Sequence, residues 1–231
     1  MLRDAWVMAR KDLTIEFSSR VTTSQVLPFG LMMLILFGFA ISPDLRVDGD
    51  TERYVVQEVA PGLFWLAVLL SALMALTRAF TVESADGGLD GLRMAGIDPA
   101  GVFLGKALAV ALQLFAIELV LGLGAFVIFD APLARPFLLV GVVVVATLGI
   151  ALAGVLYAAI AAGITTRDTL VPLLVLPVLA PVLLAATLAT REALFVEIDS
   201  QGPSWALLLA VFALLYLGVG MLAFGSLLEE S

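Results

Sequence analysis

Residues 137–163 read FLLVGVVVVATLGIALAGVLYAAIAAG, a stretch without a single charged side chain. At a rise of about 1.5 Å per residue, it is long enough to cross the roughly 30 Å hydrocarbon core of a bilayer as one α-helix. Five further stretches qualify in the same way, namely residues 24–41, 59–77, 102–129, 170–190 and 205–228. We therefore predict an all-α integral membrane protein whose six transmembrane helices form a single membrane domain over residues 1–231.

The composition excludes most soluble classes. Of the 231 residues, 62% are hydrophobic and 14% are charged, and the mean hydropathy is +1.12. Soluble domains are about half apolar and about a quarter charged. The chain has no histidine and no cysteine, which removes disulfides, thiolate chemistry, imidazole ligation of haem and most zinc or iron sites. No catalytic motif emerges, so we expect the chain not to be an enzyme by itself.

The distribution of basic residues predicts the orientation. If the N-terminus is cytoplasmic, the inner segments hold eight basic residues and the outer segments hold four. The inner set is Arg3, Arg10, Lys11, Arg20, Arg78, Arg93, Lys106 and Arg167, and the outer set is Arg46, Arg53, Arg135 and Arg191. Cytoplasmic loops carry the excess of Lys and Arg in membrane proteins. We therefore expect a multi-pass protein of the cell (inner) membrane with both termini in the cytoplasm.

The segment before the first span, residues 1–20, has the pattern of an amphipathic helix. Leu2, Trp6, Ala9, Leu13 and Phe17 recur at helical spacing, and most charged residues fall on the other side. Such a helix lies in the membrane interface. Two interpretations are open at this point: a plain interfacial anchor, or an elbow that also steers a partner subunit.

The segment at residues 78–101 combines carboxylates, glycines and regularly spaced leucines. It is longer than a hairpin of two helices needs. Two interpretations are open, a knob that docks into another protein's groove and a solvated turn between spans. The candidate coupling residues are Arg78, Glu83, Asp86, Gly87, Gly88, Leu89, Asp90 and Leu92.

Two polar residues fall inside the third predicted span. An ionised Glu118 in the bilayer is costly unless it is paired or hydrated, so it calls for a polar partner, a water-filled cavity or protonation. Gln113 is five residues earlier, so the two do not share a helix face closely. A functional relay and simple interhelical hydrogen bonding both fit. Lys106, at the start of the same span, is expected to snorkel towards the interface.

The fifth predicted span carries Pro172, Pro177 and Pro181. Each lacks an amide donor and crowds the preceding turn, so we expect this helix to be kinked or interrupted. Interrupted helices often line cavities or move, and a static kink is the alternative.

Several stretches together resemble the haem exporter protein B (CcmB) family, the permease subunit of the ABC-type cytochrome c maturation system. They are VAPGLFWLAVLLSALMALTRAF at residues 59–80, then Glu83, then DGGLDGL at 86–92, together with LVPLLVLPVLAPV at 170–182. Lys106 falls at the expected start of the family's third helix, and the similarity extends over essentially the whole chain. One departure is Gly88, where the family commonly has a small polar residue.

The resemblance implies a six-helix permease of the ABC-2 type for haem export or delivery. It further implies that the segment at 78–101 docks on a separate cytosolic ATPase subunit of the CcmA kind. Further implied partners are a haem-handling membrane protein of the CcmC kind, a haem chaperone complex and membrane lipid, without nucleic acid. We expect no tightly bound cofactor, with haem as a possible substrate.

Three other functional classes stay open. An ABC-2 permease for a drug, a lipid or a polysaccharide would share the architecture. A non-transporting assembly scaffold that releases a haem-loaded chaperone would share the partners. An intramembrane enzyme would depend on Glu118 and not on ATP.

Overall fold

The computed structural model of this chain describes residues 1–41, 45, 54–80, 96, 98–162, 167–195 and 202–230. Every element in these residues is helical. In chain order they are α1 (Leu2–Ser19), the π-helical turn η1 (Thr22–Val26), α2 (Leu27–Ala40), α3 (Val55–Arg78), α5 (Pro99–Phe129), α6 (Pro136–Ala161), α7 (Arg167–Leu194) and α8 (Gly202–Glu230). The predicted all-α membrane class is confirmed.

The helices differ in how clearly they qualify as spans. Among the described residues, α3, α5, α6, α7 and α8 are each long and apolar enough to cross a bilayer. The expected span at residues 24–41 is instead divided between η1 and α2, and α2 alone has only 14 residues. It qualifies only together with α1, as a pair of helices bent by 55°. The number of spans is therefore five, or six if this bent pair is one of them.

Local sequence explains where the longest helix, α5, begins and ends. The Asp98 side chain accepts a hydrogen bond from the Ala100 amide at 3.1 Å, and Pro99 occupies the first helical position. Both features favour a helix start. At the other end, Asp130 adopts a left-handed conformation with φ of 46°, which terminates the helix.

The core lies around α6, which packs extensively on α7 and α8. Small residues let α6 approach its neighbours closely: a Cβ atom on Gly154 would lie 2.4 Å from a terminal methyl group of Leu76 of α3, so this side chain would have to move. Close backbone approach at small residues is how helices associate in membranes, where burial of apolar area gives little drive. The small residues of α6 therefore seat neighbouring helices.

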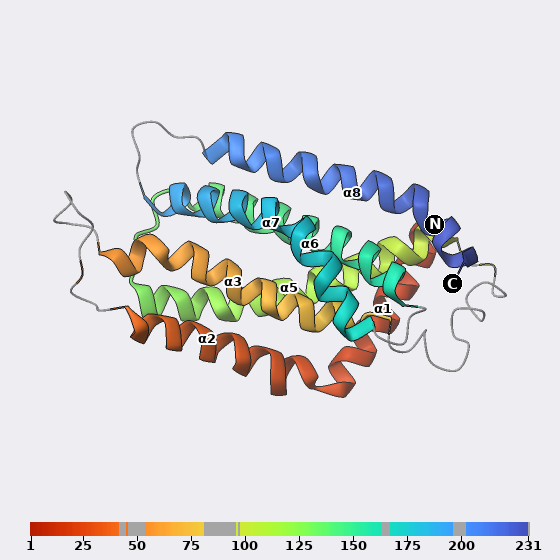
Figure 1. Cartoon of the computed structure of the whole chain (residues 1–231), viewed down its shortest axis with the longest axis horizontal. Helices are drawn as coiled ribbons and strands as arrows, with labels where there is room; N and C mark the ends of the chain where they lie inside the picture. The colour runs from red at the N-terminus through yellow and green to blue at the C-terminus, as the bar shows by residue number, and fades with distance from the viewer. Residues whose placement is uncertain are drawn as a thin grey trace.

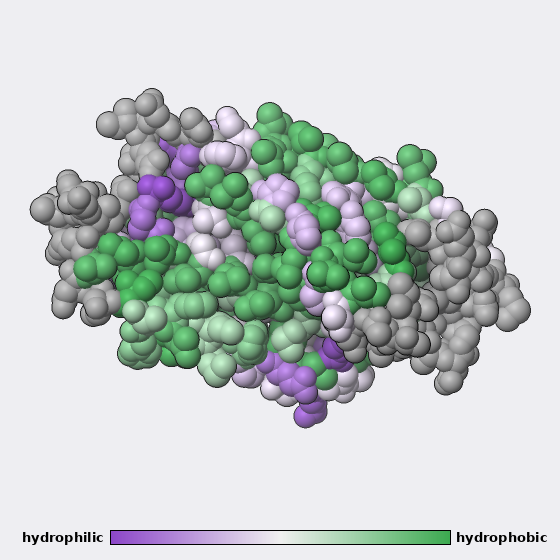
Figure 2. Space-filling model, viewed as in Figure 1, coloured by the Kyte–Doolittle hydropathy of each residue, from purple (hydrophilic) through white to green (hydrophobic). Residues whose placement is uncertain are grey.

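The start of α1 and the last turn of α8 lie at the same end of the bundle (Figure 1). On the face shown in Figure 2, hydrophobic residues make up most of the surface that the described residues present. Large apolar side chains on the outside of the bundle are largely exposed, among them Val127 (80%), Phe137 (92%) and Leu222 (87%). Exposed apolar area of this extent marks a membrane-contacting surface.

Candidate functional site

Helix α1 is docked on α5 at a glycine. A Cβ atom on Gly105 would lie 2.5 Å from the Ala5 carbonyl oxygen and 2.6 Å from the Met8 Cβ, so the two helix backbones approach closely. Ala9, which the sequence pattern placed on the membrane-facing stripe, is instead fully buried. Trp6 (60% exposed) and Phe17 (79% exposed) stay on the outer side. The helix therefore has one face on the protein and another available to the membrane.

Lys106 lies beneath α1 and is completely buried. Its ammonium donates to Asp12 Oδ2 of α1 at 3.1 Å and to the Ala79 carbonyl at the end of α3, and it lies 4.5 Å from the centre of the Phe80 ring. The expectation that Lys106 snorkels is therefore wrong. Because α1 covers the side chain and supplies a carboxylate, the ammonium is paired inside the protein and does not need to reach the interface.

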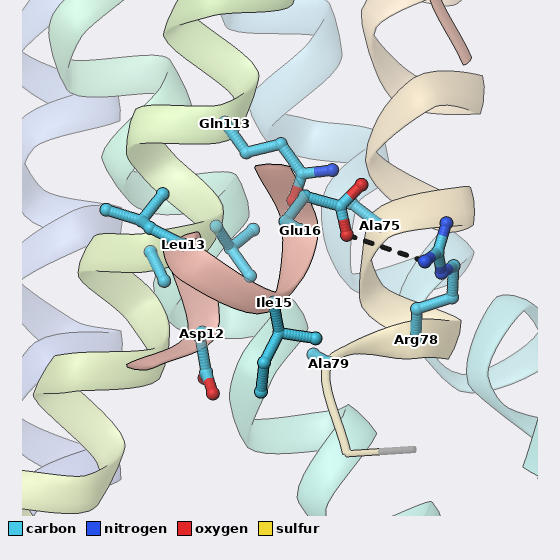
Figure 3. A pocket seen from close by; sticks show the side chains of 10 residues that line it. Asp12, Leu13, Ile15, Glu16, Ala75, Arg78, Ala79 and Gln113 are labelled. Carbon is cyan, nitrogen blue, oxygen red and sulfur yellow. Dashed lines mark ion pairs between the residues drawn. The ribbon is translucent and has the colours of Figure 1, made fainter. Parts of the chain in front are cut away.

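A second set of polar contacts surrounds a cavity of about 210 Å³ between α1, α3 and α5. Arg78 of α3 and Glu16 of α1 face each other across it with an Nη2–Oε2 distance of 3.6 Å (Figure 3). The Thr22 amide donates to Glu16 Oε1 at 3.2 Å, and the Gln113 amide donates to the Thr22 hydroxyl at 2.7 Å. These contacts tie η1 to α1 on one side and to α5 on the other.

We call this set of polar side chains the inner junction, because the predicted orientation puts it on the cytoplasmic side. It consists of Asp12, Glu16, Thr22, Arg78, Lys106 and Gln113. It joins α1, α3 and α5 next to Phe80, the residue that precedes the undescribed stretch 81–95. Its arrangement is suited to carrying a displacement from the end of α3 to the other two helices.

Of the eight candidate coupling residues, the structure describes Arg78 alone, and it belongs to the inner junction. The other seven lie outside the described residues. They are Glu83, Asp86, Gly87, Gly88, Leu89, Asp90 and Leu92.

Glu118 lies in a different place from Gln113, as expected from their spacing. It is 4% exposed and lines a cavity of about 360 Å³ that we call the outer pocket. The Thr147 hydroxyl of α6 lies 2.7 Å from Oε1 and 2.8 Å from Oε2 of Glu118. Glu118 therefore has a polar partner, the first of the three alternatives that its position called for. The walls are otherwise mostly apolar and come from α3, α5, the connection between α5 and α6, α6 and α7: Ala60, Pro61, Phe64, Phe115, Leu119, Gly122, Ala125, Phe126, Phe129, Ala131, Leu133, Leu139, Val143, Thr190 and Leu194.

The three prolines of α7 line neither cavity. The helix is continuous from Arg167 to Leu194, so it ends at none of them. Pro177 and Pro181 are exposed, whereas Val175 and Leu179 of the same helix are buried in the core. A kink at Pro172, Pro177 or Pro181 stays a prediction.

The partners of these residues were not found by sequence reasoning. Asp12 and Glu16 are one helical turn apart on α1, and this spacing could have indicated a polar face directed at protein. Thr147 is a single threonine midway along a charge-free span, and only the fold brings it to Glu118. Thr190 accepts a hydrogen bond from Trp65 Nε1 at 2.9 Å, a contact that joins α7 to α3 beside the outer pocket.

The end of the bundle away from the N-terminus is also tied by polar contacts (Figure 1). Arg191 of α7 forms an ion pair with Glu58 of α3, and the Gln57 amide donates to the Asp130 carbonyl at 2.8 Å. Within the described residues, no group of three or more His, Cys, Asp or Glu side chains could hold a metal ion.

Comparison with known proteins gives consistent matches. The family described as CcmB protein matches residues 3–231. Heme exporter protein B of Paracoccus denitrificans is 31% identical over 175 residues, 72% of each chain. That of Rhodobacter capsulatus is 31% identical over 185 residues, 74% of this chain and 77% of the relative.

The Escherichia coli protein of the same name is 32% identical over 104 residues, so the match spans only 44% of that relative's length. The family match, by contrast, covers nearly the whole chain, and the resemblance seen at residues 59–92 and 170–182 is confirmed. This chain belongs to the CcmB family.

Proposed function

We propose that this chain is the membrane permease subunit of an ABC transporter that exports haem, or delivers it, for cytochrome c biogenesis. A separate cytosolic ATPase subunit, of the CcmA kind, supplies the hydrolysis of ATP. The family match and the printed name of the relatives support haem as the substrate. The inner junction supports a role in transmitting force.

One observation carries the mechanical part of the proposal: the buried Lys106 ammonium is bonded to Asp12 of α1 and to the Ala79 carbonyl of α3 at the same time. A push on the segment at 78–101 displaces the end of α3. Because Lys106 belongs to α5, the displacement passes to α5 and α1 together. Packed helices with specific polar ties move as units, so the motion reaches the outer half of the bundle.

The other partners follow from the family. The ATPase docks on the segment that contains Leu89 and Leu92, and a haem-handling membrane protein of the CcmC kind and a haem chaperone complex act with the chain, which also contacts membrane lipid. Because the sequence has no histidine, haem is a substrate in passage and not a tightly held cofactor.

In the proposed orientation, both termini and the segment at 78–101 are in the cytoplasm. The chain has no cysteine, so labelling of a single introduced thiol shows on which side of the membrane that residue lies. Ser84→Cys in intact cells should resist a membrane-impermeant maleimide, whereas Ser42→Cys, in the segment that joins α2 to α3, should be labelled. Labelling of Ser84→Cys from outside would overturn the proposal.

Docking is tested by copurification of the ATPase with the tagged chain. Leu89→Asp combined with Leu92→Asp should abolish copurification, because carboxylates replace the apolar side chains of the docking surface. Leu45→Asp is the matched control, since Leu45 is 53% exposed and lies in the segment that joins α2 to α3. Undiminished copurification of the double variant would exclude this docking surface.

Transmission is tested separately with Lys106→Met, compared at equal amounts of chain in the membrane. We expect the ATPase to stay bound while cytochrome c maturation is lost, because the tie between α1, α3 and α5 is broken. Normal maturation in this variant would contradict a role for the inner junction. If maturation requires no ATP hydrolysis, the chain is an assembly scaffold.

A further inference from the structure

The outer pocket presents an almost entirely apolar surface. Glu118 and Thr190 are the polar residues among those that line it, and each is only 4% exposed. The Glu118 carboxyl group lies against the Thr147 hydroxyl, and the Thr190 hydroxyl accepts a hydrogen bond from Trp65 Nε1. Because both polar groups have partners within the protein, the surface left for an occupant is hydrocarbon.

The pocket is continuous with the apolar outside of the bundle. Leu119 (67% exposed), Phe126 (58%) and Leu133 (48%) line it and also belong to the membrane-contacting surface. Gly122 lies between the first two on α5, and a Cβ atom there would meet only the Phe64 ring, at 3.9 Å. The side of the pocket is therefore open to the medium that surrounds the bundle.

The pocket is also confined to one half of the bundle. Its lining residues fall in the first half of α3 and α6 and in the second half of α5 and α7. These helices alternate in direction, so all four halves lie at the end of the bundle away from the N-terminus (Figure 1). One leaflet fills roughly 15 Å of the hydrocarbon core with its acyl chains. The pocket therefore lies at the depth of the acyl chains of one leaflet.

We infer that the outer pocket is a binding site for one acyl chain of a membrane phospholipid. The chain enters from the side of the bundle between Leu119 and Phe126 and lies against Gly122. An empty cavity of about 360 Å³ leaves its walls without van der Waals contacts, and an acyl chain supplies them. Acyl chains also surround the bundle at this depth. The inference goes beyond the proposed function and does not depend on what the protein transports.

The polar part of the same phospholipid stays outside the pocket. Beyond the pocket, at the same end of the bundle, Glu58 pairs with Arg191, and the Gln57 amide donates to the Asp130 carbonyl. Charged side chains are rare within the hydrocarbon core, so these contacts mark the level of the membrane interface. The glycerol and the headgroup remain at this level, and a single acyl chain leaves the bilayer for the pocket.

The experiment uses Trp65 as a reporter in vesicles of phospholipid with brominated acyl chains, because bromine quenches indole fluorescence only at short range. Trp65 is 1% exposed, so lipid outside the bundle is kept away from it. It is bonded to Thr190 and packs edge-on against Phe64, and both of these line the pocket. Trp6→Phe and Trp205→Phe together make Trp65 the sole tryptophan. We expect its emission to be strongly quenched in brominated vesicles compared with unbrominated ones.

Variants that fill the pocket test where the lipid lies. Gly122→Leu has room for its new side chain inside the pocket and should remove most of the quenching. Ala125→Leu, about one turn further along α5, fills the same cavity independently. Gly141→Leu is the matched control, because Gly141 is not among the lining residues and a Cβ there meets nothing within 4 Å. It should keep the full quenching. An unchanged emission maximum in unbrominated vesicles shows that Trp65 is still buried in each variant.

Three outcomes would overturn the inference. Trp65 could be as bright in brominated as in unbrominated vesicles, the two filling variants could keep the full quenching, or Gly141→Leu could lose it to the same extent as they do. The last result would place the lipid on the outside of the bundle. None of these measurements involves the ATPase or cytochrome c maturation, so a failure of this site is distinguishable from a failure of the proposed function.

Discussion

The inner junction and the outer pocket use polar groups in opposite ways. At the inner junction, carboxylates meet cations from neighbouring helices, as Lys106 meets Asp12 and Arg78 meets Glu16. In the outer pocket, Glu118 has a single described donor, the Thr147 hydroxyl, among apolar walls. One region is held together by complementary charges, whereas the other contains a single buried carboxyl group among apolar side chains.

This difference indicates a division of labour along the bundle. Charge-assisted bonds between helices hold their relative positions, so the inner junction is suited to move as a unit. A cavity with mostly apolar walls and one carboxyl group is suited to receive a ligand. The two meet on α5, which carries Lys106 at one end and Glu118 further along.

The largest effect should come from separating α1 from α5. In Gly105→Ala, the new Cβ would lie 2.5 Å from the Ala5 carbonyl oxygen, so the helices must move apart. We expect the free energy of unfolding in detergent to fall by about 3 kcal/mol. Gly218→Ala is the control, because a Cβ there meets nothing within 4 Å, and it should change stability by at most about 1 kcal/mol. Equal effects of the two variants would refute close packing of α1.

The next effect tests whether the buried ammonium fastens the inner junction. Lys106→Met leaves the Asp12 carboxylate and the Ala79 carbonyl without this donor, and we expect a loss of about 2 kcal/mol in unfolding free energy. Lys11→Met removes the other lysine paired with Asp12, but Lys11 is 36% exposed, so the cost should stay below about 1 kcal/mol. In a double-mutant cycle, Asp12→Asn should be coupled to Lys106→Met and nearly additive with Lys11→Met. Additivity with Lys106→Met would contradict the contact.

The sequence indicates the two regions unequally. Hydropathy predicts the all-α membrane class and the positions of most spans. In lipid, the backbone N–H and C=O groups of a span must form their hydrogen bonds within the helix, so each span is one long apolar helix. It does not predict that Lys106 is buried, because that depends on α1 folding back over α5. It singles out Glu118 as unusual but not Thr147, since a hydroxyl in an apolar helix is common and its partner is fixed only by how α5 and α6 are packed.

The division of the first span has a similar cause. Residues 24–41 are apolar enough for a span, but the π-helical turn η1 and the bend after α1 change the direction of the chain at this point. Thr22 belongs to this turn and bonds both to Glu16 and to Gln113. The bend therefore depends on contacts with α1 and α5 that no local pattern contains.

In the outer pocket, the Thr147 hydroxyl is expected to matter only while Glu118 is present. Thr147→Val should lower the unfolding free energy by about 1.5 kcal/mol, because it leaves the carboxylate without its described donor. In a Glu118→Leu background the same change should cost at most about 0.5 kcal/mol, since no buried polar group is then left unsatisfied. Equal costs in both backgrounds would mean that the hydroxyl acts through the Val143 carbonyl alone. Thr147 would then not be a partner of Glu118 in the outer pocket.

The smallest effect on stability should come from the Arg78–Glu16 pair. The side chains are 34% and 19% exposed and their charged atoms are 3.6 Å apart, so Glu16→Gln should cost only about 0.5 kcal/mol, and less at high salt. The amide oxygen can still accept from Thr22, so the turn at η1 is preserved. The pair is nonetheless a direct link between α3 and α1, so it helps to carry a movement of α3 to α1. Glu16→Gln should therefore leave unfolding nearly unchanged and still reduce cytochrome c maturation at equal membrane levels. If Glu16→Gln supports full maturation, the Arg78–Glu16 pair is not needed for transmission and the Lys106 contacts alone carry it.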